Sequence, residues 1–147
     1  MENLLISACL AGYACKYSGG SNALSGDVLE KLRENYRLIP VCPESAGGLP
    51  TPRDPSERTG RRVVSCHGRD VTEEYRRGAA AAVTLAKKYG CKFALMKENS
   101  PSCGSGRIYD GSFSGTLTDG DGVTAEELKK NGVTVLGESR VQELFRE

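Results

Sequence analysis

Three short apolar segments, each closely followed by a cysteine, most strongly constrain how this chain can fold. The segments are residues 4–7, 37–41 and 92–96, and the cysteines that follow them are Cys9, Cys42 and Cys103. Apolar runs of this length, bounded by glycine, proline and polar residues, are typical of buried strands. Helical patterns separate them, and alternating strands and helices favour a parallel sheet. We therefore predict an α/β fold with a mainly parallel sheet flanked by helices.

The rest of the chain shows helical periodicity and clusters of turn residues. We expect helices at four places: from Ser25 or Asp27 to Asn35, and over residues 71–89, 124–130 and 139–145. Thr124 and Glu127 have the spacing of a capping box. A fourth strand is expected at residues 133–136, a short hairpin at 56–66, and an irregular excursion or a hairpin at 107–117. Residues 43–55 are rich in proline and glycine, which predicts a stiff loop without regular structure.

Size and charge restrict the class of protein. The 147 residues are expected to form one α/β domain, residues 1–147, and the 20 Lys and Arg balance 19 Asp and Glu. This balance does not favour nucleic acid or an acidic membrane surface as a partner. The sequence has no basic leader and no apolar run of roughly 18 residues, so we expect a cytoplasmic protein. Residues 78–82 form a face of small side chains that permits close packing on the sheet or on a second subunit, as in a homodimer.

The six cysteines need an explanation other than disulfide bonds, which are rare in the cytoplasm. A parallel sheet brings its strand ends to one edge, so Cys9, Cys42 and Cys103 are predicted to meet there. Cys15 could approach the same place, whereas the alternative for any single cysteine is a small buried apolar residue. The sequence has no CxxC pair of the kind that structural zinc sites usually show, so zinc is not favoured. Three thiolates without a fourth protein ligand suit an iron–sulfur cluster with one open iron.

Two polar residues near these cysteines are candidates for proton transfer. Glu44 follows Cys42 by two residues, and Ser100 precedes Cys103 by three. A carboxylate and a hydroxyl beside a Lewis-acidic centre could position or deprotonate water. The alternatives are a solvated loop charge for Glu44 and a turn cap for Ser100.

The other candidates are charged side chains and the only histidine. His67 stands in an apparent turn, where a solvated side chain is the ordinary case. Four arginines could cover an anionic ligand or form a solvated basic face: Arg53, Arg58, Arg61 and Arg62.

Four motifs, in chain order, resemble the signatures of the family known as domain of unknown function 523. They are Ser7-Ala8-Cys9-Leu10 with Gly12 and Lys16-Tyr17 with Gly19; Cys42-Pro43-Glu44 with Gly47-Gly48-Leu49 and Pro52-Arg53; Ser100-Pro101-Ser102-Cys103-Gly104; and Tyr109-Asp110-Gly111-Ser112-Phe113. The resemblance extends from the first strand to Gly137-Glu138. The chain departs from the family's frequent Arg-Tyr-Asp-Gly at Lys16-Tyr17-Ser18-Gly19, which removes an arginine and a carboxylate from this loop.

The resemblance implies a Rossmann-like three-layer sandwich and the chemistry of thiouracil desulfurases. By resemblance, Cys9, Cys42 and Cys103 hold a [4Fe-4S] cluster with one open iron, and Glu44 and Ser100 are the catalytic acid/base residues. The implied reaction is hydrolysis of a carbon–sulfur bond that converts a thiolated pyrimidine such as 2-thiouracil to uracil and releases sulfide. The partner is then a small-molecule substrate.

Two other hypotheses remain open from the sequence. One is a non-enzymatic zinc- or redox-binding cysteine module, and the other is a nucleotide-binding protein whose cysteines are incidental. Metal and acid-labile sulfide analysis separates the first from an iron–sulfur enzyme, and nucleotide binding by a triple cysteine variant tests the second.

Overall fold

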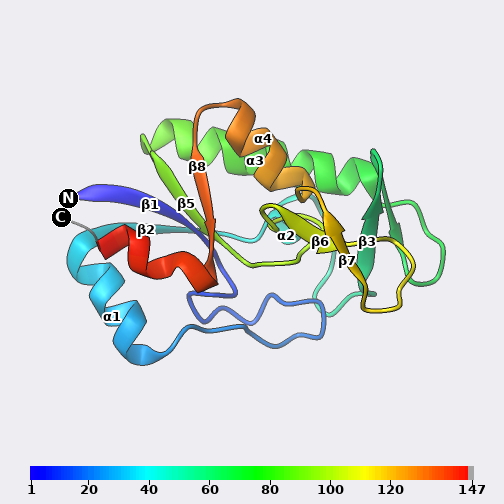
Figure 1. Cartoon of the computed structure of the whole chain (residues 1–147), viewed down its shortest axis with the longest axis horizontal. Coiled ribbons are helices and arrows are strands. Elements are labelled where there is room, and N and C mark those ends of the chain that lie inside the picture. The colour runs from blue at the N-terminus through cyan, green and yellow to red at the C-terminus, as the bar shows by residue number, and fades with distance from the viewer. Residues whose placement is uncertain (146–147) are drawn as a thin grey trace.

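A four-stranded parallel sheet forms the centre of the molecule (Figure 1). The computed structural model describes residues 1–145. The strands are arranged in the order β2-β1-β5-β8, with bounds β1 Glu2–Ser7, β2 Tyr36–Val41, β5 Phe93–Met96 and β8 Thr134–Gly137. In the register of the sheet, Leu5 of β1 lies opposite Ile39 of β2 and Ala94 of β5. The predicted α/β fold with a parallel sheet is confirmed.

Helices cover both faces of this sheet and make three layers (Figure 1). One face packs against α3 (Thr72–Lys88) and α4 (Val123–Lys130), and the other packs against α1 (Gly26–Asn35) and the 3-10 helix η1 (Glu138–Phe145). No helix among residues 1–145 is both long and apolar enough to cross a lipid bilayer.

The central strand β1 shows why both faces need cover. Its side chains alternate between the faces, so Leu4 and Ile6 pack toward α1 and η1, while Leu5 packs toward α3 and α4. All three are fully buried. Burying an aliphatic side chain of this size contributes about 1.5–3 kcal/mol relative to exposure, which makes the apolar run at β1 a strong organiser of the fold.

Local sequence signals explain how several elements begin and end. The Ser25 hydroxyl accepts a hydrogen bond from the Val28 N–H at 3.4 Å and caps α1, so Ser25 and not Asp27 is the cap of the two that were predicted. Pro40 lies in β2, which is an outer strand of the sheet, so its missing N–H removes no bond from a central strand. Asp70 accepts a hydrogen bond from the Thr72 N–H at 2.9 Å where α3 begins.

Two details of the prediction were wrong, and the type of the last helix was not predicted. The loop expected at 43–55 contains a short helix α2 (Pro43–Ala46), because proline is tolerated in the first helical turn, where its missing N–H would have no helical partner. Thr124 does not cap α4; Gly122 is the N-cap, and the buried Thr124 hydroxyl lies 2.8 Å from that of Ser102. The last helix is a 3-10 helix with a kink at Arg140.

Helix α2 and helix α3 approach each other at the level of their backbones. A Cβ added to Gly78 would lie 1.9 Å from the carbonyl oxygen of Pro43, and one added to Gly47 would lie 1.9 Å from that of Glu74. The neighbouring Ala79 and Ala82 are fully buried. The small face of α3 therefore packs inside the chain, as one of the two predicted alternatives, and a homodimer stays a prediction.

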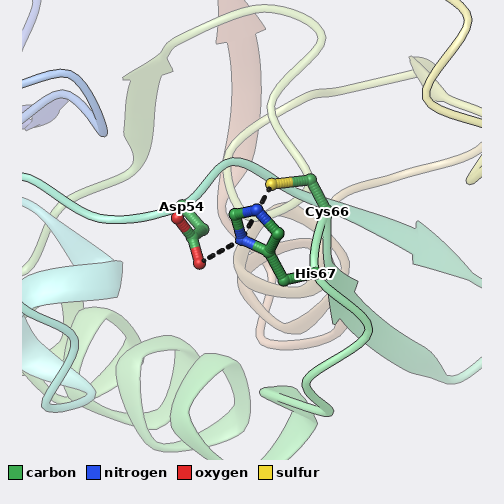
Figure 2. A group of neighbouring side chains, drawn as sticks. All are labelled: Asp54, Cys66 and His67. Atoms are coloured by element: carbon green, nitrogen blue, oxygen red, sulfur yellow. Dashed lines mark hydrogen bonds and ion pairs between the residues drawn. The ribbon is translucent and has the colours of Figure 1, made fainter.

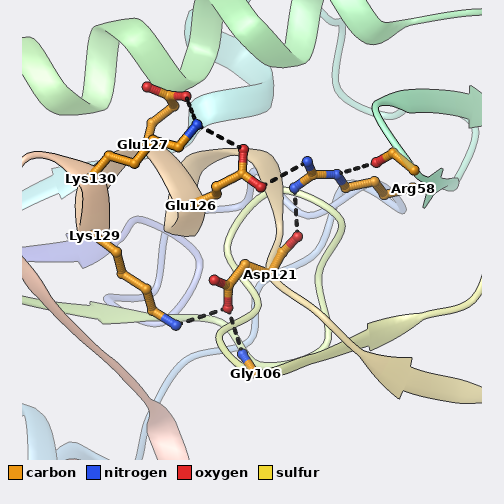
Figure 3. Close-up of polar contacts among 8 residues, drawn as sticks. Arg58, Gly106, Asp121, Glu126, Glu127, Lys129 and Lys130 are labelled. Atoms are coloured by element: carbon orange, nitrogen blue, oxygen red, sulfur yellow. Dashed lines mark hydrogen bonds and ion pairs between the residues drawn. The ribbon is translucent and has the colours of Figure 1, made fainter.

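Two short hairpins lie beyond the carboxyl ends of the sheet strands, on the right in Figure 1. They are β3 (Ser56–Thr59) with β4 (Arg62–Ser65), and β6 (Arg107–Tyr109) with β7 (Leu117–Asp119); both are antiparallel, as expected for these segments. Arg58 joins the first hairpin to the region where α4 begins, through the Asp121 carbonyl at 2.7 Å and Glu126 at 3.1 Å (Figure 3). The Asp121 carboxylate in turn accepts bonds from Gly106 and Lys129, both at 2.8 Å.

Candidate active site

A cavity of about 470 Å³ lies at the carboxyl ends of β1, β2 and β5 and is bounded by the two hairpin regions. Its lining includes four cysteines and several polar or aromatic residues: Cys9, Cys15, Cys42, Cys103, Glu44, Arg53, Tyr75, Lys97, Ser100, Tyr109 and Phe113. The position agrees with the rule that open α/β sheets bind ligands beyond the carboxyl ends of their strands. The sequence prediction that Cys9, Cys42 and Cys103 meet at this edge is confirmed.

A different local structure positions each of the three predicted cysteines. Cys9 lies in a turn directly after β1, where its carbonyl accepts the N–H groups of Gly12 and Asn22. Cys42 directly precedes α2 and is its N-cap residue. Cys103 is buried, and its N–H donates to the Ser100 hydroxyl at 3.1 Å. All are free thiols, so each sulfur is available as a ligand.

The thiols favour their protonated forms in the protein alone. Burial raises the pKa of Cys9, against the opposing effect of a hydrogen bond with Asn22. Burial and the nearby Glu44 carboxylate raise the pKa of Cys103 well above its ordinary value. Burial and the adjacent Cys42 raise the pKa of Cys15 to about 12. Metal binding to these sulfurs would therefore release protons, because the thiolate is the form that coordinates.

The spacing of the sulfurs distinguishes a site for a single metal ion from a site for a larger cofactor. Sulfurs bound to one tetrahedral zinc lie about 3.8 Å apart, given Zn–S bonds of about 2.3 Å. Among the described residues, no three of the cavity's cysteine and carboxylate side chains bring their ligand atoms within 4.8 Å of one another. At least one distance between the sulfurs of Cys9, Cys42 and Cys103 therefore exceeds 4.8 Å, which disfavours a compact zinc site and is compatible with a cluster of several irons.

Glu44 is held in the cavity wall by α2 and faces Arg53. Its Oε2 lies 3.9 Å from Arg53 Nη2, and the two side chains are only 13% and 8% exposed. Burial raises the pKa of the Glu44 carboxyl, and Arg53 partly opposes this shift. The same Arg53 nitrogen donates to the Cys15 carbonyl at 2.9 Å, so this arginine connects the carboxylate to the loop that follows β1.

Ser100 caps a turn and also lines the cavity. Its hydroxyl oxygen accepts the N–H groups of Ser102 and Cys103, both at 3.1 Å, so it does cap the turn. It also lines the cavity. Because a hydroxyl carries one donor hydrogen besides its lone pairs, these two bonds leave the Ser100 hydrogen for a group in the cavity.

Two residues that the sequence did not single out shape the cavity. The Glu57 carboxylate accepts the N–H groups of Gly111 at 2.9 Å and Phe113 at 3.1 Å, and it fixes the loop between β6 and β7. Phe113 has a φ of 57°, a conformation unusual for a residue with a side chain. Tyr75 of α3 is almost fully buried, and its burial, together with Glu44, raises its pKa.

Most of the other candidate residues from the sequence lie outside this cavity. Cys91 is buried just before β5, and Cys66 is exposed in the turn after β4. Of the four arginines, Arg53 lines the cavity, whereas Arg58 belongs to the network of Figure 3 and Arg62 pairs with Asp70 at 3.1 Å on the surface. His67 is exposed, as expected, but it lies 2.9 Å from Asp54.

The fold and the cavity define a Rossmann-like α/β enzyme with thiols gathered at the carboxyl edge of a parallel sheet. The chain belongs to the 2-thiouracil desulfurase family, whose family model matches residues 4–140. It is 41% identical over 152 residues to the uncharacterized protein YbbK of Bacillus subtilis (strain 168), a match that covers 97% of this chain and 99% of that protein.

A solved structure of the [4Fe-4S]-dependent thiouracil desulfidase TudS (DUF523Vcz) is also similar. The TM-score is 0.94 and the identity is 46%, over 99% of this chain and 96% of that one. At this identity the likeness extends beyond the fold, and it agrees with the Rossmann-like sandwich expected from the sequence.

Proposed function

We propose that this protein is a [4Fe-4S]-dependent desulfidase that hydrolyses the carbon–sulfur bond of a thiolated pyrimidine such as 2-thiouracil, giving uracil and sulfide. The observation that carries the proposal is the arrangement of Cys9, Cys42 and Cys103 around one cavity that also contains a buried carboxylate, Glu44. Family membership and the similarity to a thiouracil desulfidase support it.

The donor set suits a cluster with one iron left open. We assign Cys9, Cys42 and Cys103 as its three ligands, because they follow three different strands, line one cavity and do not all bring their sulfurs within 4.8 Å of one another. When bound, such a cluster supplies a Lewis-acidic iron with affinity for sulfur. Six free cysteines fit a reducing compartment, so we assign the protein to the cytoplasm.

The chain's own residues would bind the substrate and move protons. Glu44 is placed to take a proton from a water that attacks the carbon bearing sulfur, and Arg53 beside it holds the carboxylate in position. The Ser100 hydroxyl, with its hydrogen directed to no partner in the turn, can donate to the pyrimidine. One water supplies the oxygen and sulfur leaves as sulfide, so the reaction needs no external oxidant or reductant.

The zinc- or redox-binding module is not favoured, since the matched family and the similar solved structure are both desulfurases. The partner is accordingly a small thiolated base.

Anaerobic purification tests the proposal directly. We expect four irons and four acid-labile sulfides per chain, together with uracil formed from 2-thiouracil and measured by chromatography. Separate replacement of Cys9, Cys42 and Cys103 by serine should remove the cluster absorption, whereas Cys91→Ala, outside the cavity, should keep it. Cluster retention in all three serine variants would refute the ligand assignment. A fully loaded protein that is inactive on a panel of thionucleobases would refute the substrate class.

A further inference from the structure

We propose that Asp54, Cys66 and His67 form a second metal site, for Zn²⁺ or a similar divalent transition metal, at the rim of the cavity (Figure 2). The three side chains come from two segments, the proline-rich loop before β3 and the turn after β4. Each offers one ligand atom, and the three atoms lie within 4.8 Å of one another. None of the three residues belongs to the assigned cluster ligands, so this site stands independently of the proposed desulfuration.

Two of the three separations between the ligand atoms are close to those of a tetrahedral zinc site. Zn–S bonds of about 2.3 Å and Zn–N or Zn–O bonds of about 2.0–2.1 Å place neighbouring ligand atoms about 3.3–3.6 Å apart. His67 Nδ1 lies 3.7 Å from Cys66 Sγ and 2.9 Å from Asp54 Oδ2. Both distances are within a few tenths of an ångström of the required range, and the third pair, Cys66 and Asp54, has its ligand atoms within 4.8 Å.

The hydrogen bonds of this group converge on one atom. The thiol and the carboxylate both approach the same ring nitrogen, Nδ1 of His67. A single proton on that nitrogen can be directed at only one of them, and a bare nitrogen faces the carboxylate lone pairs. The group is therefore no relay of the Cys-His-Asp kind, which needs partners on opposite nitrogens. A cation bound by all three atoms resolves the conflict.

The backbone holds the two segments together. The Cys66 N–H donates to the Pro55 carbonyl at 2.9 Å, directly beside Asp54. The turn that carries His67 is closed by the Gly68 N–H to the Ser65 carbonyl at 2.9 Å and by the Ser65 N–H to the Arg69 carbonyl at 2.8 Å. The ligands are therefore presented by a preformed turn and a proline-flanked loop rather than by free chain ends.

The ligand types select the metal. A thiolate, an imidazole and a carboxylate are the ligands of zinc and its neighbours, whereas calcium and magnesium take oxygen ligands. The His67 and Asp54 side chains are 76% and 54% exposed, so an ion can enter and a water can fill the fourth position. Asp54 also lines the cavity next to Arg53. An occupied site would fix the segment that presents Arg53 to Glu44.

Zinc binding to the cluster-loaded protein tests this inference, because the cavity thiols are then already occupied. After chelator dialysis under anaerobic conditions, calorimetric titration should show one zinc bound per chain. Cys66→Ser, His67→Asn and Asp54→Asn should each weaken binding by about tenfold or more, while Cys91→Ala binds as the unmodified protein does. Titration with Co²⁺ should add a thiolate-to-cobalt absorption band that Cys66→Ser lacks.

A further measurement uses the unmodified protein and needs no variant. Zinc should slow the alkylation of Cys66 by iodoacetamide, and peptide mass spectrometry measures the rate of this alkylation. Absence of zinc binding to the loaded protein, unchanged affinity in all three variants, or alkylation of Cys66 at the same rate with and without zinc would overturn the proposal. No thiouracil enters these measurements, so their failure is distinct from failure of the desulfidase assignment.

Discussion

Gly78 of α3 lies directly against the Pro43 carbonyl of α2, so close that a methyl group on Gly78 would lie 1.9 Å from that oxygen. Helix α2 is only four residues long, yet it begins next to Cys42 and includes Glu44. The contact with α3 therefore sets the position of α2, and with it the positions of Cys42, a proposed ligand, and Glu44, the proposed proton acceptor, in the cavity wall. Because only glycine at position 78 permits this contact, the geometry of the site depends on that glycine.

Gly78→Ala should destabilise the protein and displace α2. Overpacking at a close contact costs about 1–3 kcal/mol, and the stress falls on backbone atoms that cannot rotate away. Urea unfolding measures the loss, and iron content and turnover report on the cavity.

A matched control for this change is Gly26→Ala. That glycine begins α1, has no positive φ, and an added Cβ meets nothing within 4 Å. Alanine there should be neutral or slightly stabilising because it restricts the unfolded chain. If Gly78→Ala unfolds at the same urea concentration as Gly26→Ala, the contact between α2 and α3 is softer than described.

Glu44→Gln should remove activity while leaving the cluster bound. The amide keeps the size of the side chain and its place beside Arg53, but it cannot accept a proton from water. General acid–base groups contribute about 10²–10⁴-fold to rate, and a loss of this size in kcat is expected at unchanged iron content. Turnover within tenfold of the unmodified enzyme would remove Glu44 from the proposed mechanism.

Glu57→Ala should loosen the loop that carries Phe113. The variant deletes the acceptor of two backbone N–H groups, and a bond to a charged group is worth about 1.5–3 kcal/mol. Because the loop lines the cavity without reaching Glu44 or the cysteines through any described hydrogen bond, KM should rise more than kcat falls.

Hydrogen exchange gives a second reading of the same change. The amides of Gly111 and Phe113 should exchange faster in Glu57→Ala, and Glu57→Gln, which keeps an oxygen acceptor, should be intermediate. Unchanged exchange at both amides in the alanine variant would show that other contacts hold the loop.

The sequence contains enough to predict the sheet and the place of the site. Short apolar runs such as residues 4–7, bounded by turn residues, favour strands buried on both faces, and parallel strands bring Cys9, Cys42 and Cys103 to one edge whatever their separation in the chain. Ser25 could be named as one of two possible caps because a cap's partner is only three residues away in the chain.

Contacts between distant segments could not be predicted in this way. Glu57 meets Phe113 across 56 residues, and the Arg53 to Glu44 pair depends on how the proline-rich loop folds back. Thr124 had the spacing of a capping residue, but its hydroxyl hydrogen-bonds with that of Ser102 because both hydroxyls are buried and each requires a hydrogen-bond partner. Tyr75 could not be assigned to the cavity from the sequence, since periodicity shows that a helical side chain is buried but not what lies beside it.

Asp70→Asn should lower stability at neutral pH and have no effect in strong acid. Hydrogen bonds with the hydroxyl and then the backbone N–H of Thr72, aided by Arg62, lower the pKa of Asp70 from 3.8 to about 2. A carboxyl whose pKa is lower in the folded protein stabilises it above the unfolded value, and this contribution is lost as pH falls through the folded value. The melting temperature of Asp70→Asn should thus lie below that of the unmodified protein at pH 7, and the two melting temperatures should converge between about pH 4 and pH 2.

The comparison is made with chelator present, so that metal at the neighbouring turn does not contribute. A difference that persists undiminished at pH 2 would show that Asp70 acts through its shape at the start of α3 and not through its charge.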